Sequence, residues 1–421
     1  MERPWGMIKD PIHGYVHISN VEKEIIDTLP LQRLRRIKQL VFADLVYPGA
    51  NHTRFEHSVG VMHLAGILGR SLPVEMSEDD VQRVRIAGLF HDLGHGPFSH
   101  TFEQILLKKL NKTHEDLTPW IINGTELKDV LTDHGFNVAD LAELAIGRSK
   151  KERAFFNQMI TSAVDVDKMD FLVRDTHHTG AEYGKVDIYR LIYTMDVLDD
   201  TLVVDSSALP TLEAFLIARV ESFKAIYYHK TARAAQILLV KAMEAADEEI
   251  GICDFKTTEE YIEMDDYSLW SELKKCERSR GIIKDLERRR LLKCAYEMEV
   301  QAEDKAVSSL FSMEGIRKQV EDEIAALAGV PSGEVFIDTP SLPSIPYRHA
   351  LDFDPMEIPI VDVEKNERKL LKATKLSRTI EVLKGFVNIV RVYTDEKNRD
   401  RVRDAAEKVL GNLPESARVS Y

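Results

Sequence analysis

The sequence predicts a mainly α-helical protein that ends in a small α+β region. Three observations favour this fold. Apolar residues recur at helical spacing in the N-terminal part of the chain. Residues 211–250 contain neither Gly nor Pro, and from about Gly329 onward Pro residues separate short β-branched segments. We therefore expect a large helical domain over residues 1–328 and a small α+β region over residues 329–421.

Two amphipathic helices are expected early in the chain. Residues 57–72 and residues 81–93 both carry apolar side chains at intervals of three and four. Two glycines and a proline follow the second segment and should end that helix. His57 should therefore lie near the start of the first helix, and His91 and Asp92 in the last turn of the second.

The later part of the chain mixes helices with short strands. Asp199 and Asp200 indicate a turn before a β-branched run, which is typical of a hairpin. The remaining expected elements are one or two helices over 211–250, a strand over 201–204, strands over 335–337 and 386–393, and a closing helix over 401–410.

Composition narrows the classes of function. The chain has 421 residues and a net charge of −14, which argues against a broad nucleic-acid surface. We expect no dedicated nucleic-acid module, and interpret the basic segment 31–38 as a solvated helix face. The three cysteines form no CxxC pair, and no apolar run approaches the ~20 residues of a membrane span. We expect a soluble, cytoplasmic protein.

Separated histidines and aspartates form a candidate metal site. His57, the adjacent pair His91 and Asp92, and the later Asp167 would supply imidazole and carboxylate ligands if three helices converge. Such a mixed set suits Fe, Mn, Zn or Ni and leaves room for water or a substrate oxygen. A metal of this kind can activate water and neutralise phosphate oxygens, so the set predicts phosphate-ester cleavage.

The segment around Asp167 supports this interpretation. Asp167, Phe171 and Asp175 are spaced by four residues and so share one face of a helix. Lys168 could reach a phosphate from the same segment. The chain lacks a GxxxxGK[ST] loop, a GxGxxG segment after a strand, an HExxH motif and a CxxC pair, so other common motifs of nucleotide and metal chemistry do not compete.

Taken together, these segments resemble the HD-domain metal phosphohydrolases and, among them, the deoxynucleoside triphosphate triphosphohydrolases. The resemblance implies an HD-domain helical bundle and weakens beyond about residue 235. The segments that carry it are Asp10-Pro11-Ile12-His13-Gly14, Gln39-Leu40, Phe55-Glu56-His57-Ser58, the block from His91 to His100, Asp165-Val166-Asp167-Lys168 and Arg174-Asp175-Thr176-His177-His178.

The resemblance implies a role for each matching position. The reaction would be water attack at the α-phosphorus of a nucleotide, which releases the deoxynucleoside and inorganic triphosphate, and Mg²⁺ could accompany the substrate. The implied roles are metal binding by His57, His91, Asp92 and Asp167; catalysis by Asp167, by His95 and by His114 and Glu115 in proton transfer; phosphate contacts by His95, His100, Arg54, Lys168 and Arg219; and sugar contacts by Gln39, Leu40, Asp175 and Tyr227.

Three positions depart from the pattern of the triphosphohydrolases. Phe171 replaces a tyrosine that contacts phosphate, Phe223 replaces a histidine, and Tyr228 replaces a glutamine. Each lost hydrogen bond is worth on the order of 1 kcal/mol. Affinity and base preference are therefore expected to shift while the hydrolytic chemistry survives.

The resemblance also implies a regulatory site and an oligomer. Asp27, Gln32 and Arg35 would read a guanine edge, and Arg289 and Lys293 would bind phosphates. A guanine nucleotide could then activate a homo-oligomer, either a dimer or a tetramer. The alternative is that Arg35 and Arg289 are surface ion-pair partners.

Two other functions stay open at this point. The first is an HD phosphohydrolase that acts on another nucleotide or phosphate ester. The second is a nucleotide-sensing module with low turnover, which the departures at Phe171, Phe223 and Tyr228 would suit. Release of intact triphosphate from a deoxynucleotide distinguishes the triphosphohydrolase from both.

Overall fold

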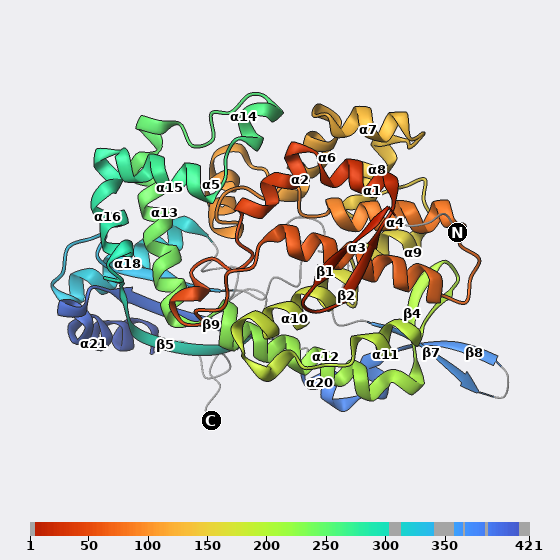
Figure 1. The fold of residues 1–421 in the computed structure, drawn as a ribbon. Coiled ribbons are helices and arrows are strands. Elements are labelled where there is room, and N and C mark those ends of the chain that lie inside the picture. The colour runs from red at the N-terminus through yellow and green to blue at the C-terminus, as the bar shows by residue number, and fades with distance from the viewer. Residues whose placement is uncertain (1–4, 303–312, 341–357, 365–366, 384–385, 412–421) are drawn as a thin grey trace.

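The computed structural model describes residues 5–302, 313–340, 358–364, 367–383 and 386–411. Helices dominate these residues, and strands form small sheets between and beside them (Figure 1). The mainly α-helical class with a C-terminal α+β part is thereby confirmed. Some of the region that begins at residue 329, including residues 341–357, lies outside the described residues.

The helices follow one another through most of the chain. The first group is α1 (Asn20–Ile26), α2 (Leu29–Arg33), α3 (Arg54–Ser71), α4 (Glu78–Phe90), α5 (His100–Leu110), α6 (His114–Gly124), α7 (Leu127–Asp133), α8 (Val138–Ala145), α9 (Ala154–Ile160), α10 (Val166–Thr179) and α11 (Ile188–Tyr193). The second group is α12 (Leu209–Ser222), α13 (Lys230–Ile250), α14 (Thr258–Ile262), α15 (Asp266–Lys275), α16 (Glu277–Glu287), α18 (Glu314–Ala328), α19 (Ala373–Leu376), α20 (Arg378–Leu383) and α21 (Arg399–Leu410).

Three small sheets contain the described strands. β1 (Gly6–Asp10) and β2 (Gly14–Ile18) form an antiparallel hairpin at the N-terminus. The second sheet has the order β3-β4-β7-β8, in which β4 and β7 are parallel, and the third has the order β5-β9-β6. Their bounds are β3 (Met195–Leu198), β4 (Thr201–Asp205), β5 (Lys293–Ala302), β6 (Phe336–Asp338), β7 (Pro359–Glu364), β8 (Glu367–Lys372) and β9 (Phe386–Thr394).

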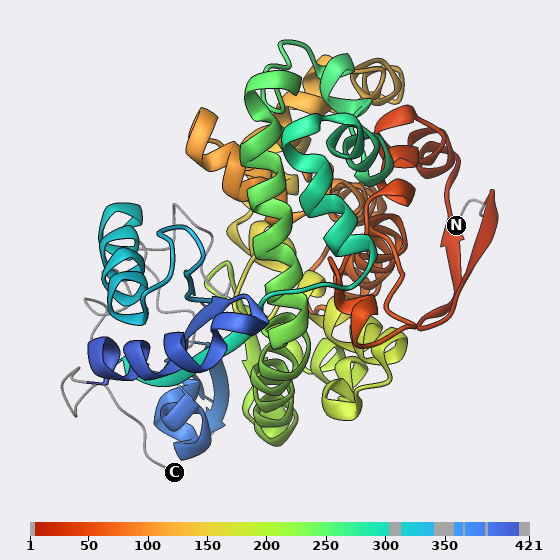
Figure 2. The same cartoon turned by 90° about the vertical axis from the view of Figure 1, so that its left-hand side faces the viewer.

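The C-terminal elements pack around a core of their own. β5, β6 and β9 share a cluster of buried apolar residues with α18 and α21, as in Val392, Val402 and Ile324. Figure 2 shows these elements together on one side, with α13 between them and the N-terminal helices. β5 and α18 precede residue 329, so elements upstream of the predicted domain boundary contribute to this core; the boundary itself stays a prediction.

Most of the expected elements are present. The structure confirms helices over 57–72 and 401–410, the pair of helices within 211–250, the hairpin strand at 201–204, and strands near 335–337 and 386–393. One expectation is wrong in detail. α4 ends at Phe90, so His91 and Asp92 lie in the turn that follows the helix rather than in its last turn.

The basic segment 31–38 is not a solvated helix face. Arg33 is fully buried, donates from Nε to the Met264 carbonyl at 2.8 Å, and lies 4.8 Å from the centre of the Tyr261 ring. Arg36 forms an ion pair with Asp265. The sequence interpretation fails because the partners of these arginines come from a segment more than two hundred residues away.

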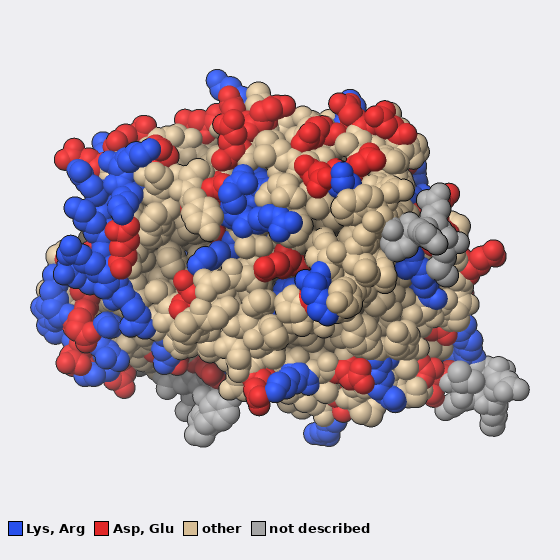
Figure 3. Space-filling model, in the orientation of Figure 1, with Lys and Arg blue, Asp and Glu red and all other residues tan. Residues whose placement is uncertain are grey.

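Basic residues gather elsewhere on the surface. In Figure 3 Lys and Arg side chains concentrate along the edge that α16 and α21 form, mixed with carboxylates. Lys274 pairs with Glu287 at 2.6 Å, and Lys293 with Glu396 at 3.3 Å. None of the described helices combines the length and the apolarity that a membrane span requires.

Three elements bring the predicted ligands to one place. α3 packs against α4 and against α10, so the start of α3, the end of α4 and the start of α10 meet. The turn after α4 lies tightly on α6: a Cβ at Gly94 would be 1.9 Å from the His114 carbonyl oxygen. A side chain at this position would push the two segments apart, so glycine is required there.

Candidate metal centre and active site

His57 and His91 point the same ring atom at each other. Thr53 caps α3 in a capping box with Glu56, which fixes the first turn that carries His57. The two Nε2 atoms of His57 and His91 lie 3.1 Å apart. Such an approach of two ring nitrogens is unfavourable unless a cation, or a shared proton, lies close to both.

The contacts of the two Nδ1 atoms determine the tautomer of each ring and so show that Nε2 is available to a ligand. His91 Nδ1 lies 2.8 Å from the Gly88 carbonyl, which can only accept, so Nδ1 carries the proton. His57 Nδ1 lies 2.8 Å from the Asp170 carboxylate and donates to it. In the neutral rings both Nε2 atoms therefore present lone pairs to the same point, as metal-ligating histidines do.

Two carboxylates complete this set. Asp167 Oδ1 lies 3.0 Å from His57 Nε2 and 3.7 Å from His91 Nε2. Asp92 Oδ1 lies 3.4 Å from His91 Nε2, and Asp92 Oδ2 lies 3.8 Å from His57 Nε2. His57, His91 and Asp167 form a group that could hold a divalent transition metal, and Asp92 lies beside it. We call these four predicted ligands the metal cluster.

The charges of the metal cluster suit a cation. Burial lowers the pKa of His57, but hydrogen bonds to Asp167 and Asp170 outweigh it and raise the pKa to about 10. The carboxylates thus attract positive charge strongly enough to hold a proton on a buried ring. Burial raises the pKa of the Asp92 carboxyl, but the Arg54 guanidinium outweighs this effect and holds that pKa well below its usual value. A divalent cation bound between these side chains would neutralise the same carboxylate charge.

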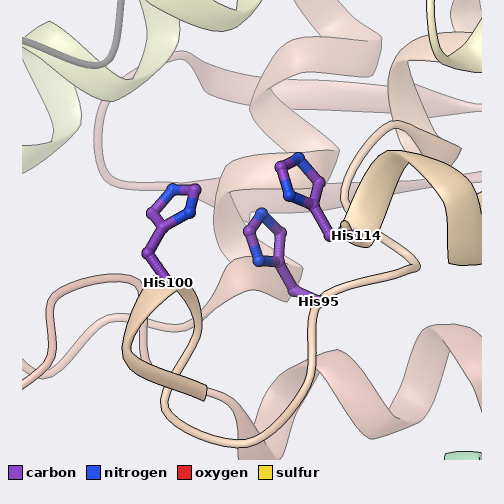
Figure 4. Close-up of side chains that lie close together, drawn as sticks. All are labelled: His95, His100 and His114. Atoms are coloured by element: carbon purple, nitrogen blue, oxygen red, sulfur yellow. The ribbon is translucent and has the colours of Figure 1, made fainter. Parts of the chain in front are cut away.

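A second group of histidines lies beside the first. Rings of His95, His100 and His114 face one another from the loop after α4, the start of α5 and the start of α6 (Figure 4). His95 and His114 stack with ring centres 3.8 Å apart. His95 Nε2 lies 3.3 Å from Asp92 Oδ1, which joins the two groups.

Glu103 orients this second group, and sequence reasoning missed it. The buried Glu103 carboxylate lies 2.9 Å from His100 Nδ1 and 2.6 Å from His114 Nδ1. The only local signal was its spacing of three residues from His100 on one helix. We call Glu103 and the three histidines the histidine cluster.

The histidine cluster is equipped to hold protons and anions. Burial lowers the pKa of His114, but the Glu103 carboxylate raises it more, so the net pKa is above the usual histidine value. Burial and the Arg54 guanidinium hold the pKa of His95 well below its usual value, so that ring is neutral. Glu115 contacts Arg148 instead of these rings.

Three cations are among the predicted phosphate contacts. Arg54 donates to Asp92 at 2.5 Å and to Ser99 Oγ at 2.7 Å. Lys168 pairs with Asp165 at 2.6 Å. Arg219 is buried, and its Nε has no hydrogen-bond partner within the described residues. A buried guanidinium with an unused donor favours an anionic ligand at this point.

The predicted sugar contacts form a separate group. The Asp175 carboxylate accepts a hydrogen bond from Tyr227 and lies 2.7 Å from Nε2 of His52, a buried residue that sequence reasoning missed. Gln39 has a buried Oε1 without a partner among the described residues, and Leu40 packs with Ile226 in a small apolar cluster.

The three departures from the family pattern have a packing explanation at two positions. Phe223 and Tyr228 form a buried cluster with Ile389 of β9, and Arg391 of the same strand donates to the Tyr228 carbonyl. The π-helical turn Phe223–Tyr227 between α12 and α13 thus contacts the C-terminal sheet. Phe171 instead faces the Tyr227 ring edge-on, with centres 6.1 Å apart.

The predicted regulatory residues are exposed, apart from the half-buried Gln32. Arg35 Nε donates to Gln32 Oε1 at 3.0 Å and its guanidinium stacks over Phe55, while Asp27 pairs with Lys23 at 2.9 Å. Arg289 donates to the Leu45 carbonyl at 3.3 Å. Arg289 has a left-handed backbone at φ 55° and ends the turn after α16.

Two family models match the chain from residue 54 to residue 420, apart from a short gap. Residues 54–175 match the HD domain, which includes the metal cluster, and residues 186–420 match the HD associated region. A solved structure of a hypothetical protein from Aquifex aeolicus covers 95% of this chain at 30% identity, with a TM-score of 0.77, and the match spans 99% of that protein.

Characterised and uncharacterised relatives both appear. A deoxynucleoside triphosphate triphosphohydrolase SAMHD1 homolog from Dictyostelium discoideum is 34% identical over 70% of this chain and 61% of its own length. Human SAMHD1 is 31% identical over 68% of this chain and 54% of its length. The uncharacterized protein YwfO from Bacillus subtilis is 36% identical over 57% of this chain and 55% of its length. The chain thus matches less than two thirds of each of these relatives.

Proposed function

Because this chain belongs to the family of HD-domain phosphohydrolases that carry the HD associated region, we propose that it is a metal-dependent deoxynucleoside triphosphate triphosphohydrolase. The observation that carries the proposal is the pair of Nε2 lone pairs of His57 and His91, which meet two carboxylates beside the histidine cluster. A ligand-binding set and a proton-donating set thus lie in contact, which phosphate-ester hydrolysis requires.

Each set has its own part in the proposed reaction. A divalent cation held by His57, His91, Asp92 and Asp167 would lower the pKa of a bound water and neutralise phosphate charge. Arg54, Lys168 and Arg219 would neutralise the remaining oxygens. Arg54 already contacts Asp92 of the metal cluster, and Arg219 has a buried Nε without a partner among the described residues. His95 and His100 would contact the phosphates next to them.

His114 is the proposed proton donor to the leaving deoxynucleoside oxygen. Glu103 raises the pKa of His114, so the ring keeps its proton to a higher pH than an ordinary histidine and can release it as the P–O bond breaks. Glu103 then stabilises the remaining proton on Nδ1. Glu115, which contacts Arg148, is proposed to act only through the position of α6.

The choice of substrate rests on the sugar group and on the relatives. Asp175 and Gln39 offer polar atoms to a 3′-hydroxyl, while Leu40 and Tyr227 would fill the space of a 2′-hydroxyl. Relatives named as deoxynucleoside triphosphate triphosphohydrolases match 70% and 68% of this chain. The departures Phe171, Phe223 and Tyr228 favour, as second candidate, hydrolysis of another nucleotide or phosphate ester.

Regulation by a guanine nucleotide in a homo-oligomer is the finer part of the proposal. Asp27, Gln32 and Arg35 of one subunit would bind the base, and Arg289 and Lys293 would bind the phosphates. Gln32 and Arg35 are already hydrogen-bonded to each other, and Arg289 and Lys293 come from a later segment of the chain.

Product identification tests the proposed function. Purified protein with Mn²⁺, and with Mg²⁺ added, would be incubated with each of the four dNTPs, with and without GTP. Chromatography should find deoxynucleoside and inorganic triphosphate in equal amounts, in wild-type protein but not in the Asp167→Ala variant. Release of pyrophosphate or monophosphate, or of no product at all, would contradict the proposal. GTP dependence that is lost in Arg35→Ala would support the regulatory site.

A further inference from the structure

A buried polar network connects the N-terminal hairpin to the metal cluster. The Asp170 carboxylate on α10 is fully buried and lies 2.8 Å from His57 Nδ1. Arg174 contacts both oxygens of Asp170, at 2.7 Å through Nε and 2.9 Å through Nη2. His13 Nε2 lies 2.6 Å from the same carboxylate, and Arg174 Nη1 donates to Asp10 at 2.8 Å. We call Asp10, His13, Asp170 and Arg174 the hairpin network.

The hairpin is built around the same groups. Asp10 ends β1, and its second carboxylate oxygen accepts the backbone N–H groups of Ile12 and His13, both at 2.8 Å. Gly14 then adopts a φ of +77°, which turns the chain into β2. The carboxylate that shapes this turn therefore also neutralises Arg174, so the turn and the buried ion pairs form one unit.

Gly60 makes room for this unit. It lies on α3, one turn after His57, and a Cβ there would be 1.9 Å from Asp170 Oδ1 and 2.4 Å from Arg174 Nη2. Any side chain would displace the carboxylate from His57. Helix α3 thus has a glycine where helix propensity alone disfavours one.

From these contacts we infer that Asp170 is the positioning residue of the metal cluster. Arg174 and His13 hold its carboxylate by hydrogen bonds, and Gly60 leaves the space that the carboxylate needs. Asp170 keeps the His57 proton on Nδ1 and aims the Nε2 lone pair at the cation site. The N-terminal hairpin is thereby part of the support of the metal cluster. The inference rests on the proposed metal site and extends it, and loss of such a partner typically weakens metal binding by about 10- to 100-fold.

The first test is a pair of matched glycine variants on α3. Gly60→Ala would push Asp170 away, whereas Gly66→Ala would press on Arg85, which forms a different buried ion pair with Glu22 at 2.6 Å. Co²⁺ affinity would be measured on the full chain by competition with a chelator, and thermal unfolding on the same samples. Gly60→Ala should bind Co²⁺ about 10- to 100-fold more weakly, and Gly66→Ala should bind it like wild type.

A second pair removes the charge instead of adding volume. Asp170→Asn places an amide N–H against an Arg174 donor and should weaken Co²⁺ binding, with Glu22→Gln as the control at the other pair. His13→Gln is a milder change within the same network and should weaken binding less.

The outcomes separate this inference from the proposed function. Wild-type affinity in both Gly60→Ala and Asp170→Asn would overturn the positioning role and leave the hydrolase proposal standing. If neither variant folds, His13→Gln decides: an unchanged Co²⁺ affinity would overturn the inference. A wild-type protein that binds no Co²⁺, Mn²⁺ or Zn²⁺ would overturn the inference and the metal site together. Equal losses in Gly60→Ala and Gly66→Ala would show a general packing effect and also overturn it.

Discussion

The metal cluster and the histidine cluster use the same residue type in opposite ways. In the metal cluster, His57 donates its Nδ1 hydrogen bond to Asp170 and His91 donates its own to a backbone carbonyl. Carboxylates face the free Nε2 atoms of both rings. In the histidine cluster one carboxylate, Glu103, binds Nδ1 of His100 and of His114, while His95 contacts Asp92 of the metal cluster. The first arrangement attracts a cation and the second holds a proton, so the placement of carboxylates decides what a histidine does.

The largest effect should follow removal of a carboxylate from the metal cluster. Asp167→Ala takes away the oxygen that lies within 4 Å of both Nε2 atoms, and we expect dNTP turnover to fall by more than about a thousandfold. Steady-state assays with added Mn²⁺ measure this effect. Asp133→Ala, on α7, is a control that should retain wild-type turnover. Near-normal turnover in Asp167→Ala would remove the metal cluster from the reaction.

A smaller loss should follow disruption of the histidine cluster. His114→Gln removes the proposed proton donor but keeps a polar side chain of similar length, and kcat should fall by roughly 10²- to 10⁴-fold. KM should change little, because Arg54, Lys168 and Arg219 remain. A loss that appears only in KM would mean that His114 binds substrate rather than transfers a proton.

The two clusters should also differ in pH response. Glu103 raises the pKa of His114, so the protonated acid persists above the usual range of histidine and kcat should fall only as pH rises through that raised value. Glu103→Gln removes the raising charge and should shift the alkaline limb of kcat to lower pH. The same pairing stabilises the fold below the pKa of an unfolded histidine and is lost as pH rises through the raised value. An alkaline limb that does not move would contradict the pairing as its cause.

The smallest expected effect concerns the substrate rather than either cluster. Phe171 lies on α10 one turn after Asp167, and Phe171→Tyr would add a hydroxyl toward the proposed phosphate side. One hydrogen bond worth about 1 kcal/mol would lower KM for a dNTP by about fivefold and leave kcat unchanged. Measurement with two different dNTPs would detect it, and a rise in KM would contradict the proposed phosphate contact at this position.

Sequence reasoning found the metal cluster because its ligands sit in recognisable local segments. The structure brings the His-Asp pair after α4 and Asp167 at the start of α10 close to His57, as the predicted ligand set requires. Sequence reasoning missed His52 and Asp170, because a hydrogen bond between residues 113 or 123 positions apart depends on how the helices pack. It also missed Glu103, although the partners His100 and His114 lie only 3 and 11 positions away. It misjudged Arg33 for the same reason as Asp170. Nothing in the sequence indicates that the distant Met264 carbonyl and the Tyr261 ring would bury this guanidinium.

The most direct test of the division between the clusters is metal content. Wild-type, Asp167→Ala and His114→Gln proteins would be loaded with Mn²⁺, passed through a desalting column and analysed by inductively coupled plasma mass spectrometry. We predict one ion per chain in wild type and in His114→Gln, and none in Asp167→Ala. Mn²⁺ retained by Asp167→Ala, or lost from His114→Gln, would contradict the account.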